Sequence, residues 1–143
     1  GVRPERLVIY GLSLGTTVAV DLAARVPHAA LVVEAGLSSA SEQATQVMPF
    51  LPRWLHWIGR NRFESARKLQ QIRTPVLIAH GTDDEVIATD HGHRLFAAAN
   101  QPKKMILVPG GSHWLPGSAG KKYIDEVAGF IKEALKKKAG QER

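Results

Sequence analysis

Four short apolar runs recur along the chain, and each one ends in a turn or passes into a helical pattern. They are residues 6–11 (RLVIYG), 29–36 (AALVVEAG), 74–81 (TPVLIAHG) and 103–110 (KKMILVPG). None of them alternates strictly between apolar and polar residues, so each predicts a buried strand. Buried strands separated by helices predict a parallel sheet that is covered by helices on both faces. The sequence therefore favours the α/β fold class.

Three helical patterns follow these runs. The first, residues 13–27, ends at Pro27 and has an apolar residue at every fourth position: Leu14, Val18, Leu22 and Val26. Residues 89–99 predict a short helix, and residues 120–138 predict a long amphipathic helix. The apolar face of the long helix is expected to hold Tyr123, Ile124, Val127, Phe130, Ile131 and Leu135.

Composition narrows the class further. A chain of 143 residues is long enough for one domain with a core, and we expect a single domain over 1–143. The chain has no cysteine, which excludes disulfides and thiol nucleophiles. The net charge of +6 comes partly from lysines in 121–138, and no nucleic-acid-binding motif accompanies them. We therefore expect a solvated helix face, no nucleic-acid partner and, without a leader or a span-length apolar run, a cytoplasmic protein.

Residues 11–15 (GLSLG) place one serine between two glycines, where a strand passes into a helix. A tight turn at this point would lift the Ser13 hydroxyl clear of the backbone, and a side chain at Gly11 or Gly15 would crowd that turn. The N–H of Leu14 would open the helix and point to where an oxyanion forms. The motif by itself also fits an ordinary turn, so its meaning depends on partners elsewhere in the chain.

The third and fourth runs end in such partners. HGTDDEV (80–86) carries Asp83 and Asp84, and GGSHW (110–114) carries His113. Because parallel strands bring their carboxyl ends to one edge of the sheet, we expect these side chains to approach Ser13. A serine hydroxyl is a nucleophile only when a base removes its proton, and an aspartate commonly orients that base. The order Ser, Asp, His along the chain therefore predicts nucleophilic catalysis.

The segments VIYGLSLG, TPVLIAHGTDDEVI and GGSHW resemble the alpha/beta-hydrolase superfamily, in particular its serine-aminopeptidase-like and protein-depalmitoylase-like single-domain branch. The resemblance implies that Ser13 is the nucleophile, His113 the general base and Asp84 the acid. Asp83 falls at a position that the family leaves variable, which implies an exposed turn residue. Glu34 matches an alternative acid position of some relatives, and we expect it instead to bond neighbouring backbone.

The resemblance also implies an activity. It implies a hydrolase of esters or thioesters that acts through an acyl-enzyme, with Leu14 providing one N–H of the oxyanion hole. Neither a metal nor an organic cofactor is expected, and the partner is a small-molecule or acyl substrate. A peptidase or an acyltransferase acting through the same three residues remains an open alternative, because the pocket selects the leaving group and the acceptor.

The position of the serine motif near the N-terminus departs from the family pattern. In the family, several strands and helices precede the nucleophile strand, and one of their loops gives the second oxyanion donor. We therefore expect a partial alpha/beta-hydrolase domain that lacks the N-terminal strands. Its free sheet edge favours self-association. Losing one oxyanion donor costs on the order of 10²–10³ in rate, so weak activity or an inactive segment is the third alternative.

Residues 37–70 interrupt the strand–helix rhythm where the family places a cap, and they predict a small helical cap insertion. Its aromatic residues fit either ordinary packing or an apolar wall for a substrate. Basic residues lie among them, a mixture that also fits docking on an anionic lipid surface. The candidate substrate-binding residues are Leu12, Met48, Phe50, Trp54, Trp57 and Trp114.

The remaining histidines predict no metal site. His91 and His93 are two residues apart, so they do not share a helix face. His80 ends the third strand and is interpreted as a structural turn residue. His28 and His56 have no partner that the sequence identifies.

Overall fold

The computed structural model describes residues 3–39 and 64–141. They form a four-stranded parallel sheet with the order β1-β2-β3-β4, which confirms the predicted sheet. The strands are β1 (Val8–Leu12), β2 (Ala30–Glu34), β3 (Val76–Gly81) and β4 (Lys103–Val108). Their carboxyl ends lie along one edge of the sheet, as expected from the parallel pairing.

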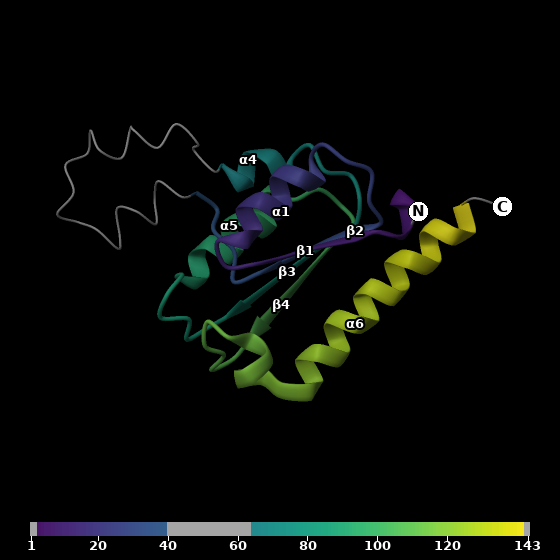
Figure 1. Cartoon of the computed structure of the whole chain (residues 1–143). Helices are drawn as coiled ribbons and strands as arrows, with labels where there is room; N and C mark the ends of the chain where they lie inside the picture. The colour runs from purple at the N-terminus through teal and green to yellow at the C-terminus, as the bar shows by residue number, and fades with distance from the viewer. Residues whose placement is uncertain (1–2, 40–63, 142–143) are drawn as a thin grey trace, which may run out of the picture.

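Helices cover both faces of the sheet, again as predicted (Figure 1). On one face α1 packs on β1 and β2, α5 packs on β3, and α4 contacts α1 and α5. The long α6 crosses the other face and contacts β2, β3 and β4. The helical elements are η1 (Pro4–Arg6), α1 (Gly15–Ala23), α4 (Ser65–Leu69), α5 (Thr89–Ala98) and α6 (Leu115–Gln141).

Burial separates the central strands from the outer ones. Every residue of β2 and β3 is buried, as their apolar runs predict. The prediction of buried strands is wrong for β1 and β4, where Tyr10 is 47% and Leu107 39% exposed. Within the described residues each of these strands pairs on one side only, so neighbouring chain covers less of its surface.

The buried face of α1 is not the one that carries its larger apolar residues. The four residues at every fourth position are exposed, and the buried face holds small side chains instead: Thr16, Thr17, Ala19, Val20 and Ala23. The reason is the short distance between α1 and β1. A Cβ built on Gly11 of β1 would lie only 2.6 Å from the Ala19 Cβ. With α1 this close to the sheet there is no room for a leucine side chain between them. The helix therefore packs with the face that carries its smaller residues.

The long helix α6 has a break near its start. Gly120 has φ 61° and ψ −152°, so a short helical segment precedes the long one. Tyr123 and Val127 are buried against the sheet as predicted. Ile124 is 50% exposed, which contradicts its assignment to the apolar face, and Ala134 is buried although its small size gave no signal. The contact face is therefore rotated slightly from the one that residue size suggests.

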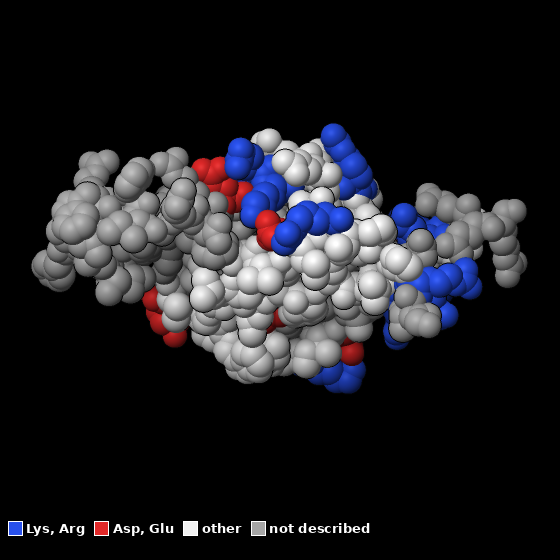
Figure 2. All heavy atoms as spheres, turned by 45° about the horizontal axis from the view of Figure 1, so that its top comes forward, with Lys and Arg blue, Asp and Glu red and all other residues white. Residues whose placement is uncertain are grey.

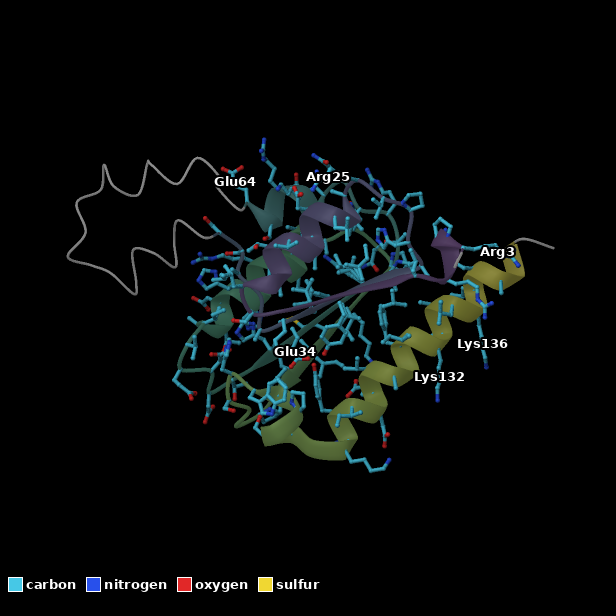
Figure 3. The ribbon with its side chains drawn as sticks, viewed as in Figure 1. Arg3, Arg25, Glu34, Glu64, Lys132 and Lys136 are labelled. Atoms are coloured by element: carbon cyan, nitrogen blue, oxygen red, sulfur yellow. The ribbon has the colours of Figure 1, made fainter. Side chains whose placement is uncertain are left out.

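The lysines of α6 lie on its solvent side. Lys132 and Lys136 point away from the sheet (Figure 3). Within α6, Lys121 pairs with Asp125, and Lys137 lies 2.8 Å from Glu133. Figure 2 shows Lys and Arg side chains at the end of the molecule where α6 finishes and, mixed with Asp and Glu, over the upper part of the view, with a broad area of other residues between. Within 3–39 and 64–141, no helix combines the length and the apolar character that crossing a bilayer requires.

Candidate active site

The turn between β1 and α1 holds Ser13 in an unusual backbone conformation. Its φ is 53°, in the left-handed region that residues with a side chain rarely adopt. Three hydrogen bonds hold the turn. The Ser13 N–H donates to the Glu34 carbonyl at 2.9 Å, and the Ser13 carbonyl accepts from the Thr16 N–H at 3.0 Å and from the Thr16 hydroxyl at 2.6 Å. Strained backbone of this kind is common at functional turns. Here the conformation directs the serine side chain away from the end of the strand.

The two glycines of the motif differ in their surroundings. A Cβ on Gly11 would lie 2.6 Å from the Ala19 Cβ and 2.7 Å from the Thr16 Cα, so a larger residue would crowd the turn as predicted. The same prediction is wrong for Gly15, because no described atom lies within 4 Å of a Cβ built there. Leu14 is the N-cap of α1, and the first amides of a helix have no partner within the helix.

Asp84 lies on the loop between β3 and α5, and its side chain is fully buried. Its Oδ1 atom accepts hydrogen bonds from the N–H of Val86 at 2.9 Å and from the N–H of Ile87 at 2.8 Å. These two bonds fix the rotation of the carboxylate. In this orientation both carboxylate oxygens lie near the imidazole: His113 Nδ1 is 2.9 Å from Oδ2 and 3.1 Å from Oδ1.

His113 connects Asp84 with Ser13. Its Nε2 atom lies 2.9 Å from the Ser13 hydroxyl oxygen, while Nδ1 contacts the Asp84 carboxylate. Since a carboxylate only accepts, Nδ1 carries the proton, and Nε2 is left to accept one from the serine hydroxyl. The imidazole is partly buried, with 23% of its side chain exposed. The structure thus brings together three residues that the sequence singled out, from three different loops.

The loops that carry Asp84 and His113 are joined to each other. The Thr82 N–H donates to the Val108 carbonyl, the Asp83 N–H donates to the Gly111 carbonyl, and each bond is 3.0 Å long. The Gly110 N–H donates to the Thr82 hydroxyl at 2.8 Å. A Cβ on Gly81 would lie 2.1 Å from the Gly111 carbonyl oxygen. Glycine at this position therefore allows the two loops to meet, a function that the sequence analysis did not assign to it.

The other residues predicted for the site lie in an exposed turn, directly beside a residue of the site in the chain, or outside the described residues. Asp83 is exposed and takes a hydrogen bond from the Thr82 hydroxyl at 2.8 Å, as expected of a turn residue. Leu12 is half-buried and precedes Ser13, while Trp114 is 57% exposed and follows His113. Four of the predicted substrate-binding residues lie outside the described residues: Met48, Phe50, Trp54 and Trp57. Of the predicted cap over 37–70, the structure describes 37–39 and the segment that contains α4.

Glu34 lies at the end of β2, on the side of the sheet that faces α6 (Figure 3). Its Oε2 atom accepts hydrogen bonds from the hydroxyls of Tyr10 and Tyr123, the latter at 2.7 Å. The expectation that its side chain bonds neighbouring backbone is therefore wrong. Burial and, after it, the hydrogen bond to Glu34 raise the pKa of Tyr10 to about 12, and the same causes raise the pKa of Tyr123 further.

Two histidines have roles that the sequence analysis did not predict. His80 is fully buried at the end of β3, with Nε2 2.9 Å from the Ile87 carbonyl and 3.3 Å from Asp84 Oδ2. His91 is buried at the start of α5, and its Nδ1 atom lies 2.8 Å from the Ser38 hydroxyl. The sequence could have indicated these roles by position: His80 directly precedes the loop that carries Asp84, and His91 lies at the start of the helix that follows this loop. Among the described residues no group of three or more potential ligands could hold a metal ion.

A parallel sheet whose strand ends present a strained serine turn, an aspartate loop and a histidine loop defines the alpha/beta-hydrolase fold, and solved structures with that fold are similar to this chain. A puromycin-hydrolyzing peptidase of Mycobacterium tuberculosis matches with a TM-score of 0.74 and 23% identity, over 94% of this chain and 22% of that one. An esterase domain of a Rhodothermus marinus protein matches with a TM-score of 0.67 and 20% identity, over 85% and 58%.

Sequence comparison identifies the family. The model of the prolyl oligopeptidase family matches residues 2–138, so the chain belongs to that family within the alpha/beta hydrolases. Human alpha/beta hydrolase domain-containing protein 17B is 36% identical over 135 residues, which are 94% of this chain and 44% of that protein. An uncharacterized protein of Mycobacterium tuberculosis is 34% identical over 92% of this chain and 47% of its own length. The chain thus spans less than half of these curated relatives.

Proposed function

We propose that this chain carries the reactive centre of a serine hydrolase that cleaves esters or thioesters through an acyl-enzyme. The observation that carries the proposal is the continuous hydrogen-bonded series from Asp84 through His113 to Ser13. His113 Nδ1 lies 2.9 Å from Asp84 Oδ2, and His113 Nε2 lies 2.9 Å from Ser13 Oγ. The membership of the chain among the alpha/beta hydrolases supports it. Esterases and a peptidase occur among the structurally similar proteins.

The proposed reaction assigns one role to each side chain. As the Ser13 oxygen attacks the substrate carbonyl, its proton passes to His113 Nε2, and a bond forms between Oγ and the carbonyl carbon. The Leu14 N–H contributes one hydrogen bond to the developing oxyanion. The imidazolium, stabilised by Asp84, then gives its proton to the departing alcohol or thiol. Water repeats the sequence on the acyl-enzyme and releases the acid together with free Ser13.

Covalent labelling tests the nucleophile directly. We expect a fluorophosphonate probe to label the wild-type chain at Ser13, and mass spectrometry of the labelled peptide identifies the residue. The S13A variant should lose labelling and at least about 10³-fold in ester hydrolysis. S112A is the matched control, because Ser112 lies beside His113 on the same loop but outside the proposed hydrogen-bonded series, and it should label like the wild type.

The same experiment separates the alternatives. A folded wild-type chain that the probe does not label would contradict the proposal and favour an inactive hydrolase segment. If the probe labels Ser13, a panel of p-nitrophenyl esters, acyl thioesters and aminoacyl amides distinguishes the proposed substrates from those of a peptidase. Acyl transfer to an added alcohol in preference to water would identify an acyltransferase.

A further inference from the structure

His80 occupies a position that the proposed reaction does not use. It lies in β3, one of the two fully buried strands, and its side chain has no exposed surface. It therefore cannot contact a substrate that reaches Ser13 from solvent. A fully buried imidazole is expected to have a specific partner, because burying an unpaired polar group costs free energy.

The hydrogen bonds of His80 define its protonation pattern. Nε2 lies 2.9 Å from the Ile87 carbonyl oxygen, which can only accept, so Nε2 carries the hydrogen. Nδ1 has no hydrogen-bond partner among the described residues. It faces α5, where a Cβ built on Gly92 would lie 2.8 Å from it. The ring is thus wedged between α5 and the loop that carries Asp84.

The Ile87 peptide group is held from both sides. Its N–H donates to Asp84 Oδ1 at 2.8 Å, and its carbonyl accepts from His80. His80 Nε2 also lies 3.3 Å from Asp84 Oδ2, the carboxylate oxygen nearer to His113 Nδ1. Its N–H dipole therefore has its positive end beside the carboxylate, and the same ring fixes the loop that orients this carboxylate.

We propose that His80 is a positioning residue for Asp84: its Nε2–H holds the Ile87 peptide so that the carboxylate stays aligned with His113 Nδ1. This inference rests on the proposed hydrolase function. His80 touches neither substrate nor the reacting atoms, and it acts only through Asp84. Without it, the loop over 82–87 loses one of its two anchors at Ile87, and the carboxylate turns away from His113.

Substitution of His80 tests this proposal. H80L removes the donor, whereas H80Q places an amide N–H where it can reach the Ile87 carbonyl. We expect H80L to lower kcat about 10- to 100-fold, the cost of a small misplacement of a reacting group, with KM changed less than about twofold. H80Q should recover kcat to within about threefold of the wild type. Titration with the fluorophosphonate probe gives kcat per reactive site, so a loss of folded protein does not enter the value.

H28L is the matched control. His28 is also buried, and its ring lies between the Val26 carbonyl, at 2.8 Å, and the Thr74 hydroxyl, near the end of the sheet where the strands begin. H28L should lower Tm and leave kcat per reactive site unchanged. If H80L behaves in the same way, with a lower Tm and an unchanged kcat per reactive site, His80 is merely structural and the proposal is wrong.

A spectroscopic measurement separates this proposal from the proposed function. In NMR of the ¹⁵N-histidine-labelled chain we expect His80 to carry its proton on Nε2, and the Nδ1 proton of His113 to give a low-field signal from its bond to Asp84. That signal should persist in H80Q and disappear in H80L or, if H80L does not fold, in G92A, where the added Cβ displaces the ring. A wild-type chain that shows the signal but is not labelled at Ser13 would refute the hydrolase activity alone. Retention of the signal in H80L or G92A would refute the role of His80.

Discussion

Ser13 adopts a backbone conformation that glycine reaches at no steric cost. At φ 53° its Cβ crowds the backbone, and such strain costs about 1–2 kcal/mol in a residue with a side chain. The hydrogen bonds to Glu34 and from Thr16 keep the turn in place despite this cost. The turn is thus maintained by its neighbours rather than by the preference of serine.

Replacement of Ser13 separates its backbone strain from its chemistry. S13G relieves the strain and S13A retains it, while both variants lose the hydroxyl. We expect S13G to be more stable to urea than S13A by about 1 kcal/mol, although glycine elsewhere costs stability relative to alanine. Unfolding curves for the two variants measure this difference. A more stable S13A would mean that the turn relaxes to a negative φ when the hydroxyl is removed.

At the scale of elements, the close approach of α1 to β1 decides which helix face is buried. The approach depends on Gly11, whose missing side chain lets Ala19 and Thr16 of α1 lie against the strand. The larger residues Val18 and Leu22 of α1 then lie on its solvent side and are 64% and 42% exposed. The helix packs with its smaller residues because backbone distance, rather than side-chain hydrophobicity, limits the contact.

The two motif glycines give a matched pair of substitutions for this contact. G11A places a Cβ 2.6–2.7 Å from α1, and overpacking of this kind costs about 1–3 kcal/mol. G15A meets no described atom within 4 Å, and alanine is the better helix former by up to about 1 kcal/mol. Urea unfolding should therefore show G11A destabilised and G15A unchanged or stabilised. Equal destabilisation by both would contradict the packing assigned to Gly11.

At the scale of the whole molecule, two exposed features lie next to each other. Among the described residues β1 pairs with β2 alone, which leaves one side of its backbone unpaired. The adjacent α1 exposes Val18 at 64% and Leu22 at 42%, and Tyr10 of β1 is 47% exposed. An unpaired edge with apolar side chains beside it favours pairing with another strand.

We propose that this 143-residue chain associates with a second copy of itself through β1 and α1. Sedimentation at increasing protein concentration should show a rising apparent mass. V18K should shift the association to higher concentration, because it places a charge in the contact. I124K, which replaces a 50% exposed residue on the opposite helix layer, should not shift it. A chain that stays monomeric and melts cooperatively at all concentrations would contradict the proposal.

Much of this molecule can be predicted from the sequence, and the errors have identifiable causes. The apolar runs located all four described strands, and the residues that follow them identified Ser13, Asp84 and His113, which the structure places in contact. The contact faces of α1 and α6 could not be predicted from the spacing of large apolar residues, because α1 packs by close backbone approach at Gly11 and α6 buries Ala134 while Ile124 is exposed. Neither effect leaves a periodic pattern in the sequence.

The sequence by itself determined which residues follow each strand. In a parallel sheet the carboxyl ends of neighbouring strands lie side by side, so the sequence also determined which of these residues lie near one another. It did not determine which side chains support them. That Glu34 bonds Tyr10 and Tyr123 and that Gly81 lets two loops meet depend on close contacts between segments far apart in the chain. That His80 holds the Asp84 loop depends on how the chain between His80 and Ile87 turns back on itself. Such contacts follow from packing in three dimensions, and only the tertiary structure decided them.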